Sequence, residues 1–170
     1  MIARTILGFG IGLVLLGVAA AAPAADKSSQ NFIKNAIEGN LAEVQMGKLA
    51  QEKSIDDGVR SFGDTLVKDH SAGNEQATAV ASSIGVTPPT EPNKKQKATY
   101  DKLSKLSGNA FDREFIKIMV EDHKKDIKEF EKAAKSSNQQ VAEFAKQTLP
   151  TLHKHLDMAQ SLAKAKAASN

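Results

Sequence analysis

The chain is divided in two by the stretch Val86-Thr87-Pro88-Pro89-Thr90-Glu91-Pro92. Its prolines exclude a regular helix, because proline has no backbone N–H and restricts the residue before it. Gly85, directly before the stretch, is a residue type that commonly ends a helix. We therefore interpret residues 86–92 as an extended crossover, which a short amphipathic helix from about Lys94 to Leu106 continues.

Two long helices are predicted on each side of this crossover, because apolar residues recur every three or four positions and no strand-like alternation occurs. They run from about Ser29 to Lys53, Ile55 to Ile84, Ala110 to Lys135 and Gln139 to Ala165. Short hinges within each pair and one long connection between the pairs predict an all-α fold, an antiparallel four-helix bundle of the ferritin-like type. Ser28 or Ser29 is the expected cap of the first helix, and Pro150 is expected to kink the last.

Residues 1–24 have the pattern of a secretory signal peptide. Arg4 precedes an apolar run from Ile6 to about Val18, and Ala22-Pro23-Ala24 fits the rule for cleavage after small residues. We expect one domain over residues 25–170, with short flexible ends at about 25–28 and 166–170, exported to the periplasm. A membrane anchor is the alternative, but the run is short for a span and no basic cluster follows it. No transmembrane span is expected once the signal is removed.

Composition argues against several classes of function. The 23 basic residues are interleaved with 20 acidic ones and do not form a stripe with aromatic residues, so nucleic-acid binding is not supported. The chain has no cysteine and therefore no disulfide or lipid attachment through a thiol. It has no nucleophile with a paired base, no phosphate-binding loop and no HExxH motif. An enzyme is thus not indicated, although redox chemistry at a bound metal stays open.

A short motif occurs twice, as Val67-Lys68-Asp69-His70 and Val120-Glu121-Asp122-His123. Each histidine falls on the apolar face of its helix, where an imidazole is costly unless it is hydrogen-bonded or holds a metal. At about 1.5 Å per residue from each hinge, Glu43, His70, His123 and His155 reach similar heights, one on each long helix. This predicts a site for one transition-metal ion. The alternative is a set of core histidines that are satisfied by hydrogen bonds.

Residues beside these four could support the site. Asp69 and Asp122 precede their histidines and point about 100° away, so each could accept an N–H from a histidine of a neighbouring helix. Surface ion pairing with nearby lysines is the alternative for both, and Asp112 is assigned the same supporting role. Gly39 and Gly47 stand four residues before and after Glu43, which suggests either a close approach by a neighbour or ordinary small-residue packing.

Methionines stand at helical spacing from the candidate ligands. They are Met46, Met119 and Met158, three or four residues from Glu43, His123 and His155 respectively. Thioether donors would favour copper, whereas one glutamate and three histidines suit zinc or iron equally well. The alternative is that these methionines fill the core.

The mature chain resembles the bacterial family called domain of unknown function 4142, from about Phe32 to Leu162. The likeness lies in the series Phe32, Ala36, Gly39, Glu43, Gly47 and Ala50, the pairs Asp69-His70 and Asp122-His123, the run Phe111-Asp112-Arg113, and Leu149-Pro150-Thr151-Leu152 followed by His155. It implies an exported ferritin-like helical protein, of a kind often labelled as an outer-membrane protein. Peripheral association with the envelope is what that label would mean for this chain.

The sequence departs from the di-iron pattern of ferritins, which places Glu-x-x-His on two helices. Val67 and Val120 occupy the two glutamate positions here, so ferroxidase or iron-storage activity is not expected. Two functions are consistent with the residues. One is a metal-binding bundle in metal handling or envelope stress, and the other is a metal-free structural or stress protein whose His, Asp and Glu side chains form a hydrogen-bonded core.

Overall fold

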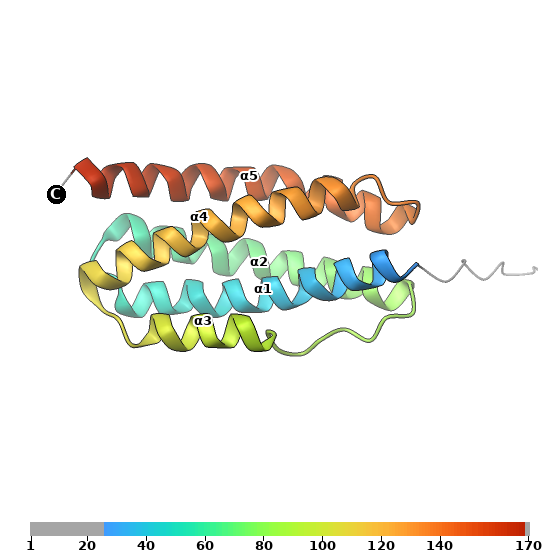
Figure 1. Cartoon of the computed structure of the whole chain (residues 1–170), viewed down its shortest axis with the longest axis horizontal. Coiled ribbons are helices and arrows are strands. Elements are labelled where there is room, and N and C mark those ends of the chain that lie inside the picture. Colours follow the sequence, from blue (N-terminus) through green and yellow to red (C-terminus); the bar gives the residue numbers. More distant parts are fainter. Residues whose placement is uncertain (1–25, 169–170) are drawn as a thin grey trace, which may run out of the picture.

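Long helices lie side by side along one axis, and a short helix flanks them (Figure 1). The computed structural model describes residues 26–168, which contain five helices and no strand. The helices are α1 (Lys27–Lys53), α2 (Asp57–Ser83), α3 (Lys94–Ser104), α4 (Gly108–Ala133) and α5 (Gln139–Ala168). The all-helical prediction is confirmed, with every helix boundary within three residues of its expected place. The predicted signal peptide lies outside the described residues.

The ends of the helices follow from local hydrogen bonds. Asp26 caps α1, since its carboxylate accepts the N–H of Ser29 at 2.9 Å. The expectation of a serine cap is therefore wrong, and the Ser29 hydroxyl instead lies 2.8 Å from that of Ser136. Where the first helix pair ends in the sequence, Gly85 has φ 73° and ends α2 as predicted. The next N–H, that of Val86, returns to the carbonyl of Ala81 at 2.8 Å.

Both ends of the described chain are helical. Residues 27–28 belong to α1, and α5 continues through Pro150 to Ala168. Near that end the ammonium group of Lys166 lies 2.9 Å from a carboxylate oxygen of Asp56 and 3.0 Å from one of Asp112. Lys166 therefore joins the end of α5 to the turn between α1 and α2.

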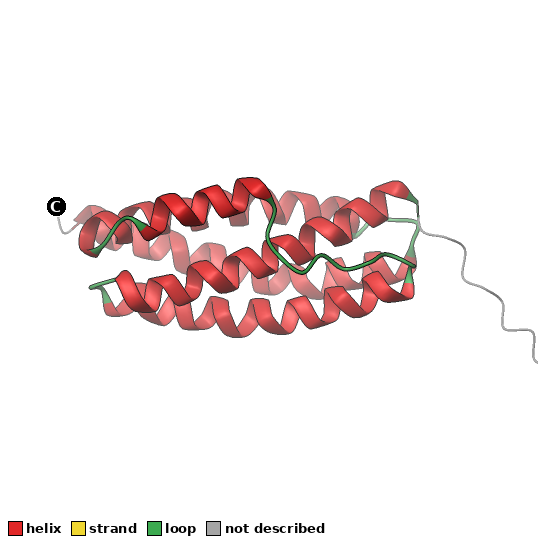
Figure 2. Ribbon diagram, turned by 90° about the horizontal axis from the view of Figure 1, so that it is seen from below, coloured by secondary structure: helices red, strands yellow, loops and turns green. Residues whose placement is uncertain are grey.

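Helix packing follows the order of the chain. Helices α1 and α2 pack closely as one hairpin, and α4 and α5 as another, while α2 with α5 and α1 with α4 join the hairpins. The connection after α2, drawn in green in Figure 2, runs back along the long helices to α3, which lies against α1. Among residues 26–168, no helix is both long and apolar enough to cross a membrane.

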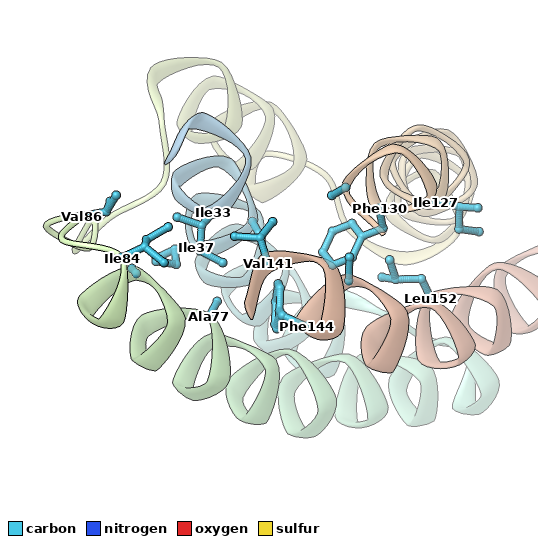
Figure 3. Close-up of a cluster of buried hydrophobic side chains, with 14 residues drawn as sticks. Ile33, Ile37, Ala77, Ile84, Val86, Ile127, Phe130, Val141, Phe144 and Leu152 are labelled. Atoms are coloured by element: carbon cyan, nitrogen blue, oxygen red, sulfur yellow. The ribbon is translucent and has the colours of Figure 1, made fainter. Parts of the chain in front are cut away.

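Two apolar clusters occupy the interior, one toward each end of the long helices. Figure 3 shows the first cluster, which includes Ile33, Ile37, Ala77, Ile84, Ile127, Phe130, Val141, Phe144 and Leu152. The second includes Met46, Leu49, Phe62, Leu66, Phe111, Phe115, Met119 and Ala159. On α2, α4 and α5 a histidine stands between the members of the two clusters. The apolar interior is therefore interrupted by a polar layer at mid-height.

Candidate metal centre

The polar layer consists of the four residues that the sequence placed at one height. Glu43, His70, His123 and His155 come from α1, α2, α4 and α5, and their exposed fractions are 2%, 6%, 0% and 0%. One ring nitrogen from each histidine lies within 4.8 Å of the corresponding nitrogens of the other two. Each of the four long helices thus contributes one of these buried polar side chains to the same region.

One ring nitrogen of each histidine makes a hydrogen bond to an oxygen atom outside the cluster. The Nδ1 atom of His70 lies 2.8 Å from Asn40 Oδ1, and that of His123 lies 2.9 Å from the backbone carbonyl of Met119. Nε2 of His155 lies 2.9 Å from a carboxylate oxygen of Asp69. All three partners are oxygen atoms that can only accept, so these three nitrogens carry the hydrogens. In each neutral imidazole the other ring nitrogen then carries a lone pair and no hydrogen, and we call it the bare nitrogen.

The bare nitrogens face one another and Glu43. His123 Nε2 lies 3.3 Å from His155 Nδ1 and 3.5 Å from Glu43 Oε2. His70 Nε2 lies 2.7 Å from the same oxygen, yet the two are not aligned as a hydrogen bond, and neither has another hydrogen-bond partner within residues 26–168. Ligands about 2.0 to 2.1 Å from a tetrahedral ion are about 3.3 Å apart. The distances from His123 Nε2 to His155 Nδ1 and to Glu43 Oε2 are therefore close to those between ligands of a tetrahedral ion, whereas the 2.7 Å from His70 Nε2 to Glu43 Oε2 is shorter.

The charge states of these groups are set by burial and by one another. Burial would raise the pKa of Glu43, but the nearby His123 and His70 lower it to about 2. Burial would lower the pKa of His70, and the Glu43 carboxylate raises it overall. For His155, burial outweighs the bond to Asp69 and lowers the pKa to about 4. An ionised carboxylate and neutral imidazoles are the forms that bind metals.

The three aspartates predicted to support the site have different surroundings. Asp69 contacts a histidine of a neighbouring helix, His155, as a supporting carboxylate would. Asp122 lines a cavity that also borders Glu43, and burial followed by the Glu43 charge raises its pKa. The expectation for Asp112 is wrong. Its carboxylate receives hydrogen bonds from Ser54 and Lys166, eleven residues or about 16 Å along α4 from His123.

The methionines lie where core filling would place them. Met46 and Met119 belong to the second apolar cluster, and Met158 packs against it. The backbone carbonyl of Met119 holds His123, a contact that any residue type could make. Met46 also lines the cavity beside Glu43 and His70. A role for the three sulfur atoms as metal donors stays a prediction.

Two residues at the site were not anticipated. Asn40 stands three residues before Glu43 and is buried, so the available signal was an amide on the inward side of α1. Asp126 stands three residues after His123, and burial followed by the charge of Glu43 raises its pKa to about 7. Both would have been found by asking which polar residues share a helix face with a candidate ligand.

Similar folds occur among solved structures. A DUF305 fragment from Deinococcus radiodurans has a TM-score of 0.72 at 17% identity, over 84% of this chain and 99% of that one. A DUF305 protein from Streptomyces coelicolor, described as secreted, has a TM-score of 0.69 at 11% identity, over 82% and 94%. Identities this low establish the fold alone. No curated protein matches in sequence. The model of the DUF4142 family, a domain of unknown function, matches residues 16–162, and the chain therefore belongs to that family.

Proposed function

We propose that this protein binds one transition-metal ion, zinc, copper or iron, through Glu43, His70, His123 and His155. It is an exported, periplasmic four-helix bundle of the ferritin-like type that serves metal handling or stress tolerance in the cell envelope. The observation that carries the proposal is the direction of the lone pairs. Outer hydrogen bonds fix the three imidazoles so that the bare nitrogens of His70 and His123 lie near one carboxylate oxygen of Glu43, and that of His155 lies near His123 Nε2.

Such an arrangement is unfavourable without a cation. Four acceptor atoms with no hydrogen between them would face one another in a buried space, and unpaired buried polar atoms cost about 1 to 3 kcal/mol each. A metal ion removes that cost, because it accepts all four lone pairs. Histidines that ligate a metal commonly donate their remaining N–H to a carboxylate or a backbone carbonyl. His155 and His123 do so here, and His70 donates instead to the side-chain amide oxygen of Asn40.

The second candidate function is the metal-free core, and one observation favours it. A proton on His70 Nε2 would make an ion pair with Glu43, whose Oε2 lies 2.7 Å away, and the raised pKa of His70 is in that direction. This arrangement accounts for one pair of facing atoms. It leaves the 3.3 Å approach of His123 Nε2 to His155 Nδ1 without a hydrogen unless a second ring is also protonated.

Metal titration of the mature protein separates the two. Chain freed of metal with a chelator is titrated with Zn²⁺, Cu²⁺ and Co²⁺, and bound metal is counted by mass spectrometry. We expect one ion per chain and d–d absorption of Co²⁺ typical of tetrahedral coordination. His123→Ala should weaken binding by at least about 100-fold, since it removes a ligand. His153→Ala is the matched control, because His153 is exposed on the same helix as His155.

The outcomes are distinct. Stoichiometric binding that disappears in His123→Ala and persists in His153→Ala supports the metal centre. Absence of binding, together with melting temperatures that do not respond to any of the three ions, rejects it. In that case the imidazole NMR titration of His70 should show a charged ring at neutral pH, as the ion-paired core requires.

A further inference from the structure

A cavity of about 210 Å³ lies between α1, α3 and α4 and reaches the centre. Glu43 and His70 line it, with side chains that are only 3% and 7% exposed. Residues of α3 and its cap line it as well; Asn93 and Lys95 are exposed, and Gln96 and Thr99 are half-buried. His123 and His155 are fully enclosed. A cation that comes through this cavity therefore meets Glu43 and His70 before the other ligands.

The wall of the cavity is rich in carboxylates. Asp122 and Asp126 on α4 are four residues apart and share a helix face, and Glu129 extends the row. Two lysines, Lys95 and Lys125, also line the cavity. Counting Glu43, four acids thus face two lysines. Negative charge in a narrow, partly desolvated space concentrates cations, and oxygen donors suit an ion that still carries water.

The innermost carboxylate is also available for a ligand. Glu43 Oε2 is buried and accepts no hydrogen bond within the described part of the chain, although it lines the cavity.

Gly39 keeps the cavity open. A Cβ atom built on Gly39 would approach nothing closer than Gln96 Nε2, at 4.0 Å. The other glycine beside Glu43 is different, since a Cβ on Gly47 would lie 2.7 Å from the carbonyl oxygen of Gly63. Helix packing thus requires glycine at 47 but not at 39. A larger side chain at 39 would project into the cavity, between α3 and the ligands.

We propose that this cavity is the route by which a divalent cation reaches the centre, and that Asp122 and Asp126 bind the partly hydrated ion on its way in. The proposal rests on the metal-binding function above. Helix α3 forms the roof of the route. It is tied to α1 by the bond of Asn93 to Glu38, at 3.0 Å, and to α4 by that of Lys102 to Glu114, at 2.7 Å.

Stopped-flow absorbance with Co²⁺ tests the route on the mature, metal-free chain. Gly39→Leu fills the cavity without altering a ligand. A route affects arrival and departure alike, so we expect association and chelator-driven dissociation to slow together, by about tenfold, while the equilibrium affinity is unchanged. Gly39→Ala, whose Cβ meets no close neighbour, provides a variant that folds, and it should slow both rates to a smaller degree.

The carboxylates have their own test. At about pH 8, where both carboxyl groups are ionised, Asp122→Asn with Asp126→Asn should slow association by about tenfold at low ionic strength and by less at high salt, because the effect is electrostatic. Glu121→Gln is the matched control, since it removes one charge from an exposed position of the same helix. Its association rate should stay close to that of the wild type.

The results distinguish the two proposals. If the wild-type chain binds no Co²⁺, both the centre and its route are rejected. If it binds Co²⁺ and Gly39→Leu and Gly39→Ala leave both rates unchanged, the route is rejected and the centre stands. A Gly39→Leu variant with altered affinity but unchanged association also rejects the route, because that result assigns Gly39 to the geometry of the ligands.

Discussion

Three hydrogen bonds around the histidines decide what the centre can do. Asn40, Asp69 and the backbone of Met119 each take up one ring N–H. Each bond fixes both the orientation of the ring and its tautomer, so the remaining nitrogen is directed inward. The chemistry of the site therefore depends on residues that would not touch the metal themselves.

Asn40→Ala tests this dependence at a single ring. Without the amide oxygen, His70 can take the other tautomer and turn away from Glu43. We expect metal affinity to fall about 10- to 100-fold, as is typical for loss of a supporting hydrogen bond. Competition with a coloured chelator measures it. Asn31→Ala, an exposed change on the same helix, should bind as the wild type does. Equal affinity of the two variants would show that Asn40 does not set the tautomer.

Asp126 should make stability depend on pH in the metal-free protein. Burial and then the charge of Glu43 raise its pKa from 3.8 to about 7. Between these values the folded state keeps a proton that the unfolded state has lost, so the free energy of unfolding falls as pH rises. Asp126→Asn does not titrate. Relative to the wild type, it should gain at least about 1 kcal/mol between about pH 4 and pH 7.5.

Urea unfolding in the presence of a chelator measures this gain, because the chelator excludes stabilisation by metal. Asp101→Asn, at an exposed position on α3, is the control and should show no comparable change with pH. A constant difference between Asp126→Asn and the wild type over the whole range would mean that Asp126 is ionised in the folded protein at neutral pH.

The sequence indicates the candidate metal ligands more clearly than the residues that hydrogen-bond to them. The cost of burying an imidazole marks His70, His123 and His155 from sequence alone. Asn40 gives a weaker signal, because an amide costs less to bury than a charge. Asp112 was misassigned since helical phase indicates that a residue faces inward but not which buried partner it meets. Its partners, Ser54 and Lys166, lie far from it in the sequence.

Two glycines of α1 stand at the same spacing from Glu43 but in different surroundings. Gly39 and Gly47 are equally distant from Glu43, yet only Gly47 touches another backbone. We expect Gly47→Ala to destabilise the protein by about 1 to 3 kcal/mol, because its Cβ would collide with the carbonyl of Gly63. Gly39→Ala should be neutral or stabilise by up to about 1 kcal/mol, since alanine favours the helix.

Urea unfolding of the two variants side by side checks the difference, and each serves as the control of the other. Similar loss of stability in both would show that α1 is crowded along its whole length. The result bears on the cavity as well, since only a tolerant position at 39 is consistent with open space beside it.

The long elements were predictable because their hinges are short. Counting 1.5 Å per residue from a hinge gives a usable height when little chain is uncertain, which is why residues as far apart as Glu43 and His155 were placed together. Caps were less predictable. Asp26, directly before the serines, was an equally suitable cap, and only the structure shows its bond to the N–H of Ser29.

The whole molecule is tied together at one end by a buried carboxylate. Asp112 is fully enclosed and binds both Ser54 and Lys166, so it links α4 to α5 and to the turn after α1. Asp112→Ala should cost about 1 to 3 kcal/mol, because it removes one acceptor of the Ser54 hydroxyl and one of the carboxylate partners of Lys166. Calorimetric melting checks this, and Asp57→Ala, at an exposed neighbouring carboxylate, should have little effect.

Metal affinity distinguishes this role from the one expected for Asp112 from sequence. At a temperature where Asp112→Ala is folded, it should bind metal as the wild type does, since its partners are remote from the histidines. A loss of metal affinity greater than that of Asn40→Ala would show that Asp112 does support the metal ligands.

The order of the four inward side chains along the chain has a consequence for when a metal can be acquired. Glu43 and His70 belong to the first hairpin, and His123 and His155 to the second. During synthesis, a growing chain offers at most three of the four groups until its last helix has emerged. Three donors hold an ion less firmly than four. If the proposed centre binds a metal, the compartment in which the final helix docks is therefore the one that supplies the ion.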